Sequence, residues 1–137
     1  QTPTHAAFLA FRREDDAIVG TFNFSEIVRG AFRSTYLGYY TFAPHAGRGY
    51  MTEGMALALD TAFGPLALHR VEVNIQPTNA RSLALAQRVG FTREGFSRRY
   101  VKIGVRGRAH VSFAMLAEDW RTLRRGHLGK RPRLDQR

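Results

Sequence analysis

The chain has 137 residues, no cysteine and a formal net charge of +10, from 21 Lys and Arg against 11 Asp and Glu. This length suits one domain, and a hydrophobic content of 44% is enough for a core. Without cysteine, a disulfide framework, a thiolate metal site and a cysteine acyl-enzyme are all excluded. No apolar run approaches the roughly 20 residues of a membrane span, and no signal peptide is visible, so we expect a cytoplasmic protein.

The chain begins with two β-prone runs, residues 6–13 and 17–24, joined by the acidic residues 14–16. A short polar connection between two such runs is typical of an antiparallel hairpin. Gly20 inside the second run indicates a bulge or a close backbone approach. Residues 25–33 contain several polar and basic side chains, and we expect a loop there.

A strand, a glycine-bearing turn and a helix follow, and we expect the rest of the chain to be organised around them. Residues 34–42 are rich in Tyr, Thr and Phe, which suit a strand, and the strand should stop before Pro44. An amphipathic helix should begin near Tyr50. Its apolar stripe, at spacings of three and four, consists of Met51, Met55, Leu59, Ala62 and Phe63.

The turn between this strand and helix contains Gly47, Arg48 and Gly49. The first N–H groups of a helix have no intrahelical partner, and the helix dipole places partial positive charge there. With Arg48 added, the turn suits a phosphate or a diphosphate. A glycine-rich connection without a ligand is the alternative for a G-x-G taken alone.

Residues 71–76 alternate between apolar and polar side chains and predict a second strand. Because a helix separates it from the strand at 34–42, the two strands should be parallel, with a right-handed crossover. The polar side chains Glu72, Asn74 and Gln76 either line a cleft or satisfy each other.

A second helix is expected over residues 80–89, with Asn79 as its N-cap and Gly90 just past its end. Residues 91–104 and 111–117 predict a final antiparallel pair of strands. The last 17 residues, 121–137, are strongly basic with almost nothing to bury, and predict a flexible tail. The domain would then span residues 1–120.

The motifs AGRGYMTEGM, PTNARS and GFTREG, which follow IVRGAF and YLGY in this order, resemble those of the Gcn5-related N-acetyltransferases (GNAT). Within that superfamily the chain resembles the ribosomal-protein-alanine N-acetyltransferases of RimJ and RimL type, over about residues 19–120. The resemblance implies a layered α+β (α/β) fold: a mixed, mostly antiparallel central sheet with a splayed parallel strand pair and flanking helices. The family normally opens with a strand and two helices, so we expect its N-terminal helices to be absent here.

The resemblance also implies a cofactor, acetyl-CoA, and site residues. Bound coenzyme A would contact Phe42, Ala46, Gly47, Arg48, Gly49, Tyr50, Met51, Asn79 and Ser82. Ser82 would in addition give a proton to the departing thiolate. No metal is implied.

Two positions depart from the family pattern. Ala46 replaces the side chain that opens the family's phosphate turn, so one contact to phosphate is lost. Arg99, before Tyr100, stands where RimL-like enzymes place an acidic residue proposed as the base. The chemistry of the remaining carboxylates leaves Glu72, Glu53 and Glu94 as candidates, and we rank Glu72 first because its strand borders the splayed pair.

Three functions remain in contention on the sequence. The first is acetyl transfer to the N-terminal α-amino group of a protein, with a ribosomal protein as the family-based acceptor. The second keeps the reaction but changes the acceptor to a small amine or an aminoglycoside. The third is a catalytically inactive basic RNA-binding protein, suggested by the excess of arginine, the expected absence of the N-terminal portion and Arg99. Separately, the charge of the tail suggests contact with RNA or the ribosome. The oligomeric state is left open.

Overall fold

A computed structural model describes residues 4–42, 49–97, 101–102, 105–106, 109–125 and 133–136. Its centre is a seven-stranded sheet in the order β5-β8-β4-β3-β2-β1-β9. The strands of this sheet are β1 (Ala6–Phe11), β2 (Ile18–Val28), β3 (Ser34–Thr41), β4 (Arg70–Ile75), β5 (Thr92–Ser97), β8 (His110–Leu116) and β9 (Arg133–Gln136). The helices are α1 (Tyr50–Phe63), α2 (Ala80–Val89) and α3 (Ala117–Arg124), and the short strands β6 (Val101–Lys102) and β7 (Val105–Arg106) pair with each other.

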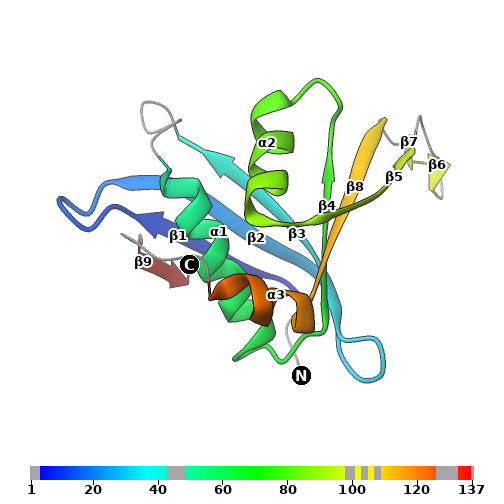
Figure 1. Cartoon of the computed structure of the whole chain (residues 1–137), viewed down its shortest axis with the longest axis horizontal. Coiled ribbons are helices and arrows are strands. Elements are labelled where there is room, and N and C mark those ends of the chain that lie inside the picture. Colours follow the sequence, from blue (N-terminus) through cyan, green and yellow to red (C-terminus); the bar gives the residue numbers. More distant parts are fainter. Residues whose placement is uncertain are drawn as a thin grey trace.

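The predicted parallel pair is present and splays apart. β3 and β4 pair in parallel at only three positions: Ser34 with Arg70, Thr35 with Val71, and Tyr36 with Glu72. Beyond these positions β3 stays with β2 as far as Thr41 and β4 stays with β8 as far as Ile75, so the strands separate (Figure 1). Within the described strands, the backbone N–H and C=O groups of β3 after Tyr36 and of β4 after Glu72 therefore do not hydrogen-bond to each other. We call this opening the fork.

All three helices lie on the same side of the sheet (Figure 1). The side chains that β2, β3 and β4 direct toward them are buried, among them Phe22, Leu37 and Val73. Alternate residues point to the opposite side. There Tyr36 and Tyr40 remain 40% and 63% exposed. The described part of the chain thus has one covered face and one open face.

Two glycines let α1 approach the sheet closely. A Cβ atom on Gly54 would lie 2.8 Å from Cε2 of Phe22, and one on Gly20 would lie 2.6 Å from Sδ of Met51. The close approach predicted at Gly20 is confirmed. α1 therefore packs directly against β2. Met51 and Met55, from the apolar stripe predicted for this helix, are buried between the helix and the sheet.

The predicted loop at residues 25–33 is wrong in its first part, because β2 continues to Val28. The pairing with β3 shifts register between Ser25 and Val28, where Glu26 has a positive φ of 48°. This irregularity keeps Ile27 buried, at 5% exposure. The extra residue in the bulge disguised the alternation that marks a strand.

The predicted boundary between a domain at 1–120 and a flexible tail at 121–137 also differs from the structure. α3 continues through Arg124, and both Trp120 Nε1 and Arg124 Nε donate hydrogen bonds to the carboxylate of Asp60 in α1. Residues 133–136 form β9, which pairs with β1. The basic sequence of residues 121–137 shows no apolar periodicity. The backbone pairing of β9 and the ion pair of Arg124 form without such a pattern, so the sequence did not predict them. Nowhere in the described ranges does a helix combine the length and apolar character needed to cross a membrane.

Candidate active site

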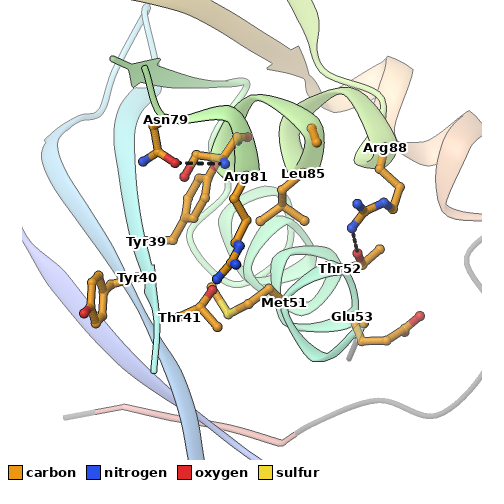
Figure 2. A pocket seen from close by; sticks show the side chains of 13 residues that line it. Tyr39, Tyr40, Thr41, Met51, Thr52, Glu53, Asn79, Arg81, Leu85 and Arg88 are labelled. Atoms are coloured by element: carbon orange, nitrogen blue, oxygen red, sulfur yellow. Dashed lines mark hydrogen bonds between the residues drawn. The ribbon is translucent and has the colours of Figure 1, made fainter. Parts of the chain in front are cut away.

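A pocket of about 740 Å³ lies between the end of β3, the start of α1 and one side of α2 (Figure 2). Its volume falls in the range typical of small-molecule and cofactor sites, about 300–1,000 Å³. The lining residues are Tyr39, Tyr40, Thr41, Gly49, Met51, Thr52, Glu53, Asn79, Arg81, Ser82, Ala84, Leu85 and Arg88. The pocket opens where β3 leaves β4, so it adjoins the fork.

The floor of the pocket is the N-terminus of α1. Gly49 caps this helix in the left-handed conformation, with φ of 80°, and as a glycine it offers no side-chain cap to the first turn. A positive φ favours glycine, which explains this residue at this position. The uncapped N–H groups of the first turn carry the positive end of the helix dipole and suit an anion. Of the residues predicted to hold phosphate, Gly49 and Met51 line the pocket, whereas residues 46–48 lie outside the described part of the chain.

The upper wall of the pocket is the first turn of α2. The side chain of Asn79 accepts a hydrogen bond from the backbone N–H of Ser82 at 3.1 Å, so the predicted N-cap is confirmed. Gly90 ends the helix in the left-handed conformation, also as predicted. Ser82 is half-buried and lines the pocket. Its hydroxyl donates no hydrogen bond to another described residue, which leaves that proton available to a ligand.

Tyr39 connects the two sides of the pocket. Its hydroxyl donates a hydrogen bond to the backbone carbonyl of Ser82 at 3.1 Å, and its ring packs beside Phe22. Burial raises the pKa of Tyr39 to about 12, against a smaller opposing effect of the hydrogen bond to Ser82. The phenol therefore stays protonated at neutral pH and acts as a donor.

Two arginines of α2 that were not predicted as site residues, Arg81 and Arg88, also line the pocket. Arg88 Nη1 donates a hydrogen bond to the hydroxyl of Thr52 in the first turn of α1, at 3.0 Å. Their spacing of seven residues, two helical turns, places them on one face of α2 and was the available sequence signal. That signal could not show which face points into the pocket.

Glu72, the predicted base, does not line this pocket. It occupies the last paired position of β4, opposite Tyr36, and its neighbours in sequence, Val71 and Val73, are buried under the helices. Strand alternation therefore directs Glu72 to the open face, at the vertex of the fork. The predicted network among Glu72, Asn74 and Gln76 is not what these side chains form: Arg70 donates to Glu72 Oε1 at 3.0 Å, and the Ser112 hydroxyl donates to Asn74 Oδ1 at 2.9 Å.

Arg70 also bonds to both carboxylate oxygens of Glu94, at 2.6 and 3.0 Å. This contact lowers the pKa of Glu94, and both acidic partners raise the pKa of Arg70.

Glu53, another candidate base, lines the pocket. Two residues predicted to contact the cofactor, Phe42 and Tyr50, do not line the pocket. Phe42 packs its ring against Tyr40, and Tyr50 lies under the guanidinium of Arg12.

The comparisons with known proteins agree with this architecture. The chain is 36% identical over 113 residues to the [Ribosomal protein uS5]-alanine N-acetyltransferase of Escherichia coli, covering 82% of this chain and 58% of that protein. It is 38% identical over 112 residues to the probable N-acetyltransferase YjcK of Bacillus subtilis, covering 82% of this chain and 62% of that one. The chain therefore spans about 60% of the length of these curated relatives.

Among solved structures, Mycobacterium smegmatis RimJ in complex with CoA-disulfide matches with a TM-score of 0.69 and 34% identity, over 77% of this chain and 50% of that one. Ribosomal-protein-S5-alanine acetyltransferase from Vibrio fischeri matches with a TM-score of 0.72 and 26% identity, over 84% of this chain and 63% of that one. The acetyltransferase (GNAT) domain family matches residues 1–92. With the fork, the helix N-terminus and these matches in agreement, the chain belongs to the GNAT acetyltransferase family.

Proposed function

We propose that this chain is an acetyl-CoA-dependent N-acetyltransferase whose acceptor is the N-terminal α-amino group of a protein. The observation that carries the proposal is the fork between β3 and β4, which opens beside a pocket whose floor is an uncapped helix N-terminus. The family match supports the reaction, and the relatives that act on ribosomal-protein alanine support the acceptor.

The described residues fit coenzyme A. Its diphosphate needs donors and positive charge, which the first turn of α1 and Arg81 supply. Its pantetheine arm needs a narrow channel with backbone donors and acceptors, which the separated halves of β3 and β4 supply. Asn79 and Ser82 stand at the side of that channel, on the first turn of α2.

Bound acetyl-CoA supplies the acetyl group as a thioester. Backbone N–H groups of β3 beyond Tyr36 would donate to the carbonyl oxygen, where negative charge grows during attack by the amine. The Ser82 hydroxyl would give its proton to the departing thiolate. Glu72 would accept the proton of the amine, directly or through one water, from the open face.

A protein α-amino group suits this arrangement because its reference pKa is about 7.7–8.0, so a useful fraction is neutral near pH 7.5. A lysine amine, at about 10.4, would need a stronger base. Glu72 already has Arg70 as an ionic partner, so an amine that is partly neutral without the help of a base fits the site better. The exposed tyrosines of the open face, Tyr36 and Tyr40, would contact the acceptor chain.

The proposal is tested by following thiol release from acetyl-CoA with the purified chain and three acceptors. These are a peptide with a free N-terminal alanine, the same peptide with a blocked N-terminus and an internal lysine, and spermidine. We expect turnover with the first peptide alone. If only spermidine is acetylated, the acceptor is a small amine and the proposal of a protein N-terminus is wrong. Absence of turnover with all three, together with salt-sensitive RNA binding, would favour the basic RNA-binding alternative.

A further inference from the structure

Arg81 and Arg88 differ from several other arginines of the described chain in having no carboxylate partner there. Arg12 pairs with Asp15, Arg70 with Glu72 and Glu94, and Arg124 with Asp60. Arg81 and Arg88 instead line the cofactor pocket, and neither forms an ion pair with a described residue. Their charges are therefore available to a ligand with negative charge.

The two guanidinium groups stand on different sides of the α1 N-terminus. Figure 2 shows Arg81 extending over Met51 and Thr41, on the side of β3 and the fork. It shows Arg88 beside Thr52, on the side of α1 that is farther from β3. The first turn of α1 lies between them, so a diphosphate bound there would have one arginine on each side.

Coenzyme A carries its third phosphate on the ribose, on the opposite side of the diphosphate from the pantetheine arm. The pantetheine arm must enter the fork, past Tyr39 and Thr41, for the thioester to reach the separated strands. The ribose of a bound coenzyme A would therefore lie on the other side of the helix N-terminus, where Arg88 is found.

We propose that Arg88, oriented by Thr52, binds the 3′-phosphate of coenzyme A and makes the site selective for coenzyme A over dephospho-coenzyme A. The proposal rests on the cofactor part of the proposed function and is independent of the acceptor. A phosphate monoester carries about −1.5 to −2 charges near pH 7, so this single phosphate has more charge than either phosphate of the diphosphate.

The geometry around Arg88 suits such a group. One of its five N–H donors is used by the Thr52 hydroxyl, which fixes the side chain and leaves a planar pair of donors for two phosphate oxygens. The Thr52 hydroxyl accepts from Arg88 and keeps its own proton for a third phosphate oxygen. Figure 2 shows Glu53, the acidic residue of this turn, on the side of Thr52 that is away from Arg88.

The test is calorimetric titration of coenzyme A and of dephospho-coenzyme A into the wild-type chain and three variants, with no acceptor present. Arg88→Gln should weaken binding of coenzyme A about 10- to 100-fold, the loss expected for a charge-assisted contact, and leave dephospho-coenzyme A within about twofold. Arg81→Gln should weaken both ligands alike, because it faces the shared diphosphate. Arg93→Gln, which removes an exposed arginine from β5 outside the pocket, should change neither.

Two results would overturn the proposal: equal affinity of the wild-type chain for both ligands, or an equal loss for both in Arg88→Gln. Should Arg88→Gln fail to fold, Thr52→Val and Arg88→Lys report on the same contact, and unchanged selectivity in both would count against it. No heat of binding with either ligand would remove the cofactor site itself. Intact selectivity without peptide acetylation would instead show that only the acceptor is wrong.

Discussion

The hydroxyl of Tyr39 in β3 and the backbone carbonyl of Ser82 in α2 are joined by a hydrogen bond of 3.1 Å across 43 residues of sequence. β3 and β4 are paired at only three positions, so the distance from β3 to α2 depends on contacts of this kind on the helix side. The bond fixes the first turn of α2, and with it the proposed proton donor, against the strand that borders the fork.

Replacing Tyr39 by Phe should therefore weaken both folding and catalysis. We expect the free energy of unfolding to fall by about 1 kcal/mol, the typical net value of one hydrogen bond, because the ring and its packing against Phe22 remain. The KM for acetyl-CoA should rise and kcat should fall several-fold as α2 shifts. Urea denaturation and steady-state kinetics measure these effects. Tyr40→Phe is the matched control for stability alone, since Tyr40 is 63% exposed but lines the same pocket; an equal loss of unfolding free energy in both variants would contradict the role of the bond.

The raised pKa of Tyr39 also predicts how stability changes with pH. The phenol ionises near pH 10 in the unfolded chain but at about 12 in the folded one, since burial disfavours the phenolate. The folded state thus holds this proton more tightly. The associated stability, at most about 3 kcal/mol, is complete below pH 10 and is lost as pH rises from 10 to 12.

Melting curves recorded at intervals from pH 8 to 11.5 measure this dependence. The difference in unfolding free energy between wild type and Tyr39→Phe should shrink and then change sign over that interval, because Phe has no proton to lose. A difference that stays constant with pH would show that Tyr39 ionises equally in both states.

Replacing Ser82 by Ala tests its assignment as proton donor. We expect kcat to fall by about 100-fold or more, the usual size of a positioned acid, with little change in the dissociation constant of acetyl-CoA. The cap is unaffected, because the bond to Asn79 comes from the backbone N–H of Ser82. Asn79→Ala is the comparison: losing the cap should cost about 1 kcal/mol of stability. If Ser82→Ala retains wild-type kcat, the thiolate takes its proton elsewhere.

The parts of the site that follow from local chemistry were predictable from the sequence. Asn79 and Gly90 mark the two ends of α2. A strand, a helix and a second strand in succession predict the parallel pairing of β3 and β4. The bond between Arg88 and Thr52, by contrast, joins residues 36 apart on different helices. The periodicity of apolar residues in each helix does not show which face of α1 contacts which face of α2.

The bulge at Glu26 and the contacts of Asp60 with α3 cannot be predicted from the sequence for a related reason. An irregular strand breaks the alternation that reveals strands. The contact of α3 with α1 uses one ion pair and one hydrogen bond to Asp60, and α3 buries only Ala117 and Trp120, too few residues for a recognisable apolar stripe. The sequence predicts that the strand of Glu72 borders the fork, and the structure agrees, but no sequence pattern reveals its ionic partner two residues earlier, Arg70.

Replacing Glu72 by Gln tests it as the base. Gln keeps the size of the side chain but cannot take a proton, so kcat/KM should fall by at least about 10-fold and the acidic limb of its pH profile should change. Glu94→Gln is the control, because it removes the other carboxylate on Arg70 and leaves Glu72 in place. An unchanged pH profile in Glu72→Gln would remove this residue from the mechanism.

Gly54→Ala tests whether the close approach of α1 to β2 positions the cofactor pocket. In an exposed helix interior this change adds about 1 kcal/mol of stability. Here the new methyl group would lie 2.8 Å from Cε2 and 2.9 Å from Cζ of Phe22, whose fully buried ring packs against Tyr39. Because that ring cannot move aside freely, overpacking of about 1–3 kcal/mol should exceed the gain. We therefore expect a lower melting temperature and weaker binding of acetyl-CoA, since the helix N-terminus moves with α1.

The double variant Gly54→Ala/Phe22→Leu distinguishes this overlap from a general loss of packing. Phe22→Leu alone should be destabilising, because it leaves space in the core. In the Gly54→Ala background the same space accepts the new methyl group, so the two costs should not add, and calorimetry should recover part of the affinity for acetyl-CoA. Strict additivity of both stability and affinity would mean that the ring of Phe22 does not set the height of α1 above the sheet. The position of the diphosphate site would then have to be fixed by the contacts between α1 and α2, through Thr52 and Arg88.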